Sequence, residues 1–96
     1  MATYISLVNW TDQGIRAYRE STARAAAANE LAAKFGGRMT LIWWTIGPYD
    51  LVAVSEFPDD ESAVAFALAL GSGGNIRTTT MRAFGSAEMA EIVART

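Results

Sequence analysis

The sequence contains neither histidine nor cysteine, and these two absences exclude more chemistry than any residue it contains. Without cysteine, the chain has no disulfides, no thiolate nucleophiles and no thiolate metal sites. Without histidine, imidazole-based triads and axial histidine ligation of haem are also excluded. A metal site would have only oxygen donors as ligands, which suit magnesium or calcium better than zinc, copper or haem, and we expect no metal and no cofactor. General acid and base chemistry falls to Asp, Glu, Tyr or the single lysine, Lys34.

Strong charge of one sign and long apolar runs are missing as well. Eight basic and ten acidic residues leave no basic stripe for phosphates, so nucleic acid is not an expected partner. No apolar stretch approaches the roughly 20 residues that cross a membrane, and the first residues lack a charged leader. We expect a cytoplasmic protein with no membrane association. The 96 residues, 51% of them apolar, predict a single domain over residues 1–96.

Four stretches have the β-branched and aromatic composition of strands, namely residues 3–10, 39–46, 51–57 and 75–84. One helix is expected to begin at Thr11, restart at Ser21 and end at Phe35, before a glycine pair. A second is expected from the acidic turn at residues 58–61 to Gly71, and a short third from Ser86. The order β-α-β-β-α-β predicts an α+β, ferredoxin-like plait with an antiparallel sheet and an extra C-terminal helix.

Both alternating faces of the two strands at 39–46 and 51–57 are largely apolar. An antiparallel sheet with one face in water would instead alternate apolar and polar residues. Helices therefore cover one face and something else covers the other, for which a second copy of the sheet is the expected partner. This pattern predicts a homodimer or a larger assembly of the same chain.

The turn at residues 47–50, Gly-Pro-Tyr-Asp, places Tyr49 and Asp50 at the mouth of the predicted hairpin. A phenol there can donate a hydrogen bond or a proton, and a carboxylate can accept a proton or orient a polar substrate. In the structural alternative, Asp50 accepts hydrogen bonds from backbone N–H groups and Tyr49 plugs the end of the sheet. Both interpretations stay open on the sequence alone.

Two pairs of residues complete the candidate ligand site. Trp43 and Trp44 point to opposite faces of one strand, so we expect one under the helices and the other at an interface or a ligand cavity. Arg77 and Arg82 also lie on opposite faces, so only one of them faces a cavity. That arginine either binds a substrate carboxylate or forms a salt bridge, with Glu56 as the expected partner. The sequence does not distinguish which tryptophan or which arginine faces inward.

The chain resembles the GYD-domain family, within the wider group of dimeric α/β barrels. The resemblance rests on residues 4–15, on the stretch Trp-Thr-Ile-Gly-Pro-Tyr-Asp at 44–50, and on residues 57–60 and 70–77. It implies that two sheets pair face to face into a barrel. It supplies no catalytic residues, because relatives in the wider group include cofactor-independent monooxygenases, muconolactone isomerases and haem-dependent chlorite dismutases.

Three functional hypotheses follow from these observations. The leading one is an oligomer that binds a small, partly apolar molecule in a subunit cavity near Tyr49, Asp50, one tryptophan and one arginine. The second is a cofactor-independent isomerase or monooxygenase-like enzyme, with Asp50 as base and Tyr49 or an arginine stabilising negative charge. The third is a structural or regulatory oligomerisation module whose two sheet faces are filled by protein.

Overall fold

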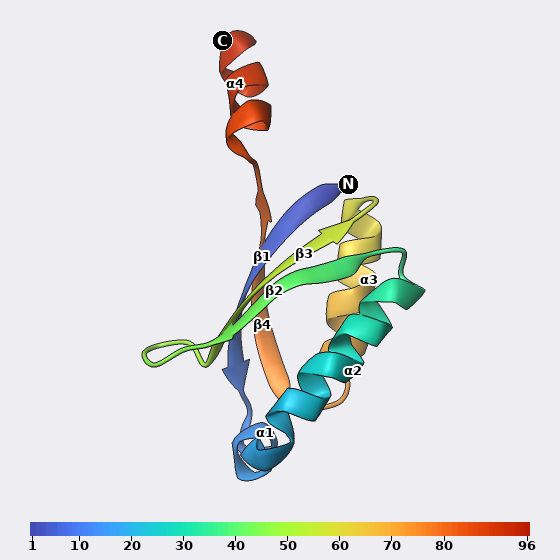
Figure 1. Ribbon diagram of the computed structural model, residues 1–96, viewed down its shortest axis with the longest axis vertical. Coiled ribbons are helices and arrows are strands. Elements are labelled where there is room, and N and C mark those ends of the chain that lie inside the picture. The colour runs from blue at the N-terminus through green and yellow to red at the C-terminus, as the bar shows by residue number, and fades with distance from the viewer.

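A computed structural model describes all 96 residues, which form a four-stranded sheet with the two long helices on one face (Figure 1). The strands are β1 (Ala2–Trp10), β2 (Arg38–Trp44), β3 (Leu51–Phe57) and β4 (Ile76–Ala83). The helices are α1 (Asp12–Arg16), the 3-10 turn η1 (Tyr18–Glu20), α2 (Ser21–Lys34), α3 (Asp60–Gly71) and α4 (Ser86–Ala94). The sheet order is β2-β3-β1-β4 and every neighbouring pair is antiparallel. This topology confirms the predicted ferredoxin-like plait with an extra C-terminal helix.

Side-chain caps explain where the helices begin. The Thr11 hydroxyl accepts a hydrogen bond from the backbone N–H of Gly14 and starts α1. The Asp59 carboxylate does the same for Ser62 at 2.8 Å and starts α3. α2 begins at Ser21, where the sequence predicts a restart, and α3 ends at Gly71, where a glycine-rich loop follows. The loop at residues 71–74 is therefore a helix terminus, as its position between a helix and a strand indicates.

β2 is shorter than predicted and irregular. It ends at Trp44 rather than at residue 46, and its pairing with β3 shifts between Met39 and Leu41. The bulge places Leu41 opposite Val54 and keeps the apolar residues in rows across the sheet. After this one extra residue, the side chains of β2 again alternate between the two faces in register with the rest of the sheet.

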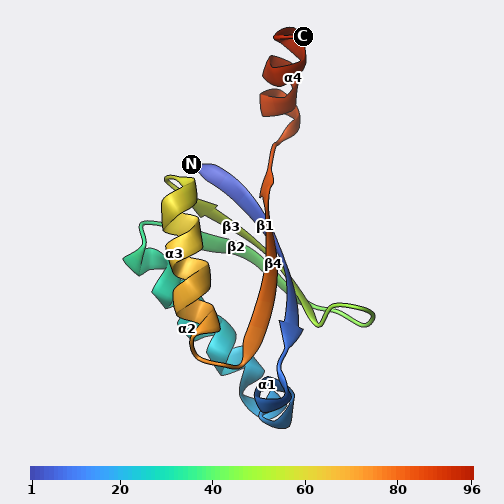
Figure 2. The same cartoon turned by 180° about the vertical axis from the view of Figure 1, so that it is seen from behind.

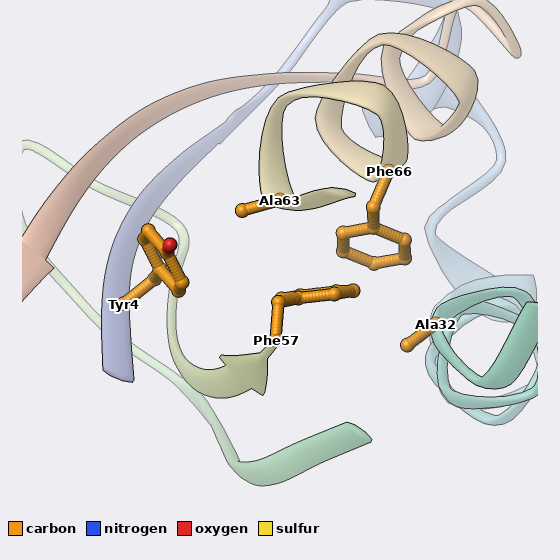
Figure 3. Close-up of a cluster of buried hydrophobic side chains, with 5 residues drawn as sticks. All are labelled: Tyr4, Ala32, Phe57, Ala63 and Phe66. Carbon is orange, nitrogen blue, oxygen red and sulfur yellow. The ribbon is translucent and has the colours of Figure 1, made fainter. Parts of the chain in front are cut away.

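The core lies between the sheet and the two long helices (Figure 3). Its buried cluster consists of Tyr4, Ala32, Phe57, Ala63 and Phe66. The Phe57 ring is 1% exposed and lies 5.1 Å from the Phe66 ring centroid and 6.2 Å from that of Tyr4. These aromatic contacts join β1 and β3 to α3.

α4 stands away from the rest of the fold, beyond the end of β4 (Figure 2). None of its residues is buried. Its first turn is fixed by Glu88, which accepts a hydrogen bond from the Gly85 backbone N–H and lies 3.4 Å from the Arg82 guanidinium. The junction with β4 is thus held by local contacts, while the apolar residues Met89 and Val93 remain exposed.

Candidate functional site

The sheet face opposite α2 and α3 is covered by no helix of the chain (Figure 2). Strand register places two apolar rows across it. The first row is Leu41, Val54, Ile5 and Met81, and the second is Trp43, Val52, Leu7 and Thr79. We call these eight residues the bare sheet face. Leu41, Trp43 and Met81 of this face are exposed. This exposure confirms the prediction that the helices cover only one of the two apolar faces of the sheet.

The two tryptophans point to opposite sides of the sheet, as their adjacency predicts. Trp43 lies on the bare sheet face and is 65% exposed. Trp44 pairs with Leu51 on the helix side, beside Ala25 and Ala26 of α2, but is still 43% exposed because β2 is an edge strand. Only Trp43 therefore belongs to the uncovered surface.

The turn at residues 47–50 is held by backbone hydrogen bonds, several of which involve Asp50. Its carboxylate oxygen Oδ2 accepts a hydrogen bond from the Trp10 backbone N–H at 2.8 Å. Its own N–H donates to the Val8 carbonyl at 2.8 Å, and its carbonyl accepts from the Thr45 N–H at 2.9 Å. The Thr45 hydroxyl donates to the Tyr49 carbonyl. This geometry matches the structural alternative for Asp50, which ties the hairpin loop to the end of β1.

We expect Asp50→Ala to lower the free energy of unfolding by about 1–3 kcal/mol, because it leaves the partly buried Trp10 N–H without its acceptor. Asp50→Asn keeps a side-chain oxygen and should cost about 1 kcal/mol or less. Urea denaturation of the two variants and the parent protein measures both effects. An Asp50→Ala protein as stable as the parent would contradict a structural role for this carboxylate.

The two arginines have different surroundings. Arg77 lies opposite Asn9 on the side of the bare sheet face and is exposed. Arg82 lies on the helix side, with its guanidinium carbon 4.4 Å from the Phe84 ring centroid and 5.8 Å from that of Tyr4. The expected salt bridge with Glu56 is formed by neither of them. Glu56 pairs with Arg38 at 2.7 Å, and Arg82 pairs with Glu88 of α4.

A buried phenol lies next to Arg82. The Tyr4 hydroxyl donates a hydrogen bond to the Asp60 carboxylate at 2.5 Å. Burial and, to a smaller extent, the hydrogen bond to Asp60 raise the pKa of Tyr4 from 10.0 to about 12, although the Arg82 charge opposes the rise. The phenol is therefore neutral near pH 7 and serves as a hydrogen-bond donor.

This raised pKa makes stability fall in alkaline solution. The folded protein holds the Tyr4 proton more tightly than the unfolded chain, so its contribution is complete below pH 10 and is lost as the pH rises to about 12. We expect Tyr4→Phe to show a shallower fall over that interval. Urea midpoints measured at several pH values for both proteins provide the comparison, and equal slopes would contradict the assignment.

A cavity of about 290 Å³ lies between the sheet and the helices α2 and α3. Eighteen of its 26 lining residues are hydrophobic, and many of the others carry hydroxyl groups. None of the six predicted ligand residues, Tyr49, Asp50, Trp43, Trp44, Arg77 and Arg82, lines it. They are also not gathered elsewhere, because the turn lies beyond the end of the sheet and the two pairs split between its faces.

Sequence reasoning missed the residues that do line the cavity. The available signal was the run of small residues, Ala25 to Ala28 in α2 and the alternate alanines in α3. No cluster of three or more Asp or Glu side chains that could hold a metal ion occurs, and no helix is both long and apolar enough to span a membrane.

Comparison with known proteins gives consistent results. The family model described as GYD domain matches residues 4–93. A protein of Thermus thermophilus named glutamine synthetase and cystathionine beta-lyase binding protein is 33% identical over 96 residues, covering 99% of this chain and 98% of that protein. The crystal structure of TTHA0845 from Thermus thermophilus is 25% identical with a TM-score of 0.58, covering 90% of this chain and 96% of that one. The chain belongs to the GYD domain family.

Proposed function

We propose that this protein works by docking other proteins, with a second copy of itself on the bare sheet face and a larger enzyme bound by the pair. The observation that carries the proposal is the bare sheet face itself. Eight neighbouring side chains form two rows across four strands, seven of them are apolar, and no part of the chain covers them. Such a continuous exposed apolar patch on a small protein is typical of an interaction surface.

The composition of the patch supports a protein as occupant. Trp and Met are enriched at the centres of protein interfaces, and charged residues are depleted there. Trp43 and Met81 lie within the two rows, which contain no charged residue. The nearest charges flank the two rows along the strands, where Glu56 pairs with Arg38 beyond the first row and Arg77 lies opposite Asn9 beyond the second. The face therefore has an apolar centre and a polar rim.

A second copy is the partner whose shape matches this surface. Two sheets can pack face to face about 10 Å apart, with the side chains of the inner faces interdigitating. An identical sheet has the same width, length and row spacing, so a two-fold pairing buries both apolar faces at once. This arrangement corresponds to the homodimer that the sequence predicts.

The enzyme part of the proposal rests on the Thermus thermophilus relative, whose name says that it binds glutamine synthetase and cystathionine beta-lyase. The similarity extends over nearly the whole of both chains, so the surfaces of the relative have counterparts here. The test measures, by biolayer interferometry, the binding of this protein to purified glutamine synthetase and to purified cystathionine beta-lyase from its own organism. We expect saturable binding to at least one of the two enzymes. If neither enzyme binds, only the enzyme part of the proposal is overturned.

Binding of a small apolar molecule is a second candidate function, favoured by the cavity between the sheet and the helices. Catalysis is not part of the proposal. The carboxylate expected to act as base, Asp50, accepts a hydrogen bond from the Trp10 backbone and lies outside the cavity lining. The cavity and the bare sheet face are on opposite sides of the sheet, so the two functions are compatible.

A further inference from the structure

We infer that the cavity between the sheet and the helices is a binding site for a neutral, mainly apolar molecule of about the size of two fused rings, held by serine and threonine hydroxyls. The inference deepens the second candidate function above and names its ligand class. It rests on the volume of the cavity, on the residues that keep it open, and on the charges and hydroxyls of its wall.

The volume sets the size of the ligand. A dry apolar cavity of about 150 Å³ is large enough to bind benzene. The cavity here, at about 290 Å³, has roughly twice that volume. A two-ring molecule or a branched chain of similar bulk therefore fits, whereas a nucleotide or a haem does not.

Small side chains on all three walls keep the space open. They are Ala25 and Ala28 of α2, Ala63 and Ala67 of α3, and Ala53 of β3. Protein interiors are normally packed as densely as organic crystals, because unfilled space forfeits dispersion contacts. A leucine at several of these positions would fill the space. Because these residues are alanine, they leave a cavity, and an apolar ligand would fill the space that leucine side chains would otherwise occupy.

Charge on the wall indicates a neutral ligand. Arg24 is the only charged side chain among the lining residues, and its guanidinium already binds the Glu20 carboxylate at 2.8 Å and the Ala17 carbonyl at 3.3 Å. A carboxylate, phosphate or ammonium group in the cavity would lose its hydration without gaining an unpaired counter-charge. Neutral molecules avoid this cost.

Hydroxyl groups on the sheet wall provide the polar contact. Ser55 lines the cavity at 5% exposure, yet its hydroxyl takes part in none of the side-chain hydrogen bonds of the fold. Because no fully buried side-chain polar atom lacks a partner, this hydroxyl must remain open to the cavity. Ser6 and Thr80 share a hydrogen bond at 2.9 Å and also line the cavity. A ligand with one hydroxyl or carbonyl group can bind at this wall.

The test uses three probes of equal ring size on the full chain, with binding measured by isothermal titration calorimetry at pH 7. 1-Naphthol is neutral with one hydroxyl, naphthalene lacks the hydroxyl, and 2-naphthoate is charged. We expect saturable binding of 1-naphthol and at least tenfold weaker binding of 2-naphthoate. Ser55→Ala should weaken 1-naphthol binding several-fold and leave naphthalene binding unchanged.

Cavity-filling variants locate the site. Ala67→Leu on α3 and Ala25→Leu on α2 fill it from different walls, so each should weaken 1-naphthol binding at least tenfold. Ala33→Leu, on the exposed side of α2, is the matched control and should bind as the parent does. The inference is overturned if 1-naphthol does not bind the parent, or if a folded Ala67→Leu or Ala25→Leu protein binds it with full affinity.

A further variant separates this inference from the proposed docking function. Trp43→Glu alters the bare sheet face on the opposite side of the sheet, so it should change self-association and not 1-naphthol binding. Loss of pairing with retained 1-naphthol binding is the expected result and supports both proposals. Retained pairing in a folded Trp43→Glu protein would overturn only the docking of a second copy on the bare sheet face, whereas a parent protein that pairs but does not bind 1-naphthol would overturn only the cavity site.

Discussion

Trp43→Glu is expected to raise the dissociation constant of the proposed homodimer by about 30-fold or more. A tryptophan at the centre of a protein interface commonly contributes about 2 kcal/mol or more to binding, and about 1.4 kcal/mol corresponds to a factor of ten. Trp43 lies in the second row of the bare sheet face and is its most exposed large side chain. Glutamate would also bring an unpaired negative charge against the same face of the partner copy. Sedimentation velocity over a range of concentrations measures the change.

Trp44→Glu is the matched control for this experiment. It changes the same residue type on the same strand, but its side chain points to the helix side of the sheet. We expect Trp44→Glu to leave the dissociation constant within about threefold of the parent value, which corresponds to roughly 0.6 kcal/mol. Equal loss of pairing in both variants, or a parent protein that stays monomeric at high concentration, would contradict docking through the bare sheet face.

The sequence was sufficient to predict the architecture, because the fold depends on patterns that are local and repeated. Side chains alternate along each strand with a period of two, so the apolar residues on both faces of β3 predicted that helices cover one face and that something else covers the other. Helix starts were predictable for the same reason, since Thr11 and Asp59 act within three residues of themselves. The order of the strands and helices then indicated a single known topology, the ferredoxin-like plait.

The candidate ligand residues were harder to predict because their roles depend on contacts between distant parts of the chain. Asp50 accepts its hydrogen bond from Trp10, 40 positions away, and no pattern near residue 50 indicates that partner. The choice between Arg38 and the two later arginines for Glu56 depended on strand register, which the β2 bulge shifts. Alternation correctly separated Arg77 from Arg82 but could not show which side each one faced.

The cavity was beyond sequence reasoning for a different reason. Its volume is set by the distance between the helices and the sheet, and alanine is compatible with two outcomes. A helix rich in alanine can approach a sheet closely and leave no space, or it can be held at a normal distance by larger neighbours and leave a gap. Phe57 and Phe66 supply such large side chains at one part of the same interface. The structure shows the second outcome, with small residues facing the cavity beside the aromatic cluster.

The importance of this cluster makes Phe57→Ala the most destabilising single substitution that we expect. Removing a buried phenylalanine side chain costs about 3–5 kcal/mol, because transfer energy is lost and a cavity remains. We expect a value in the upper half of that range, since Phe57 is 1% exposed and lies on β3, which is paired on both sides and cannot move to fill the gap. A domain of this size has a total stability of about 5–15 kcal/mol, so the loss is a large fraction of it.

Phe84→Ala is the matched control, because it deletes the same side chain at a position that is 51% exposed, with the Arg82 guanidinium carbon 4.4 Å from the ring centroid. Its cost should stay below about 1 kcal/mol, the usual value of an exposed cation–π contact. Urea denaturation with an unchanged m-value gives both numbers on one scale. A Phe57→Ala protein that loses no more stability than Phe84→Ala would mean that β1, β3 and α3 are held together elsewhere. Because Phe57 also borders the cavity, the same variant enlarges the proposed ligand site, and an apolar probe that binds there should restore part of the lost stability.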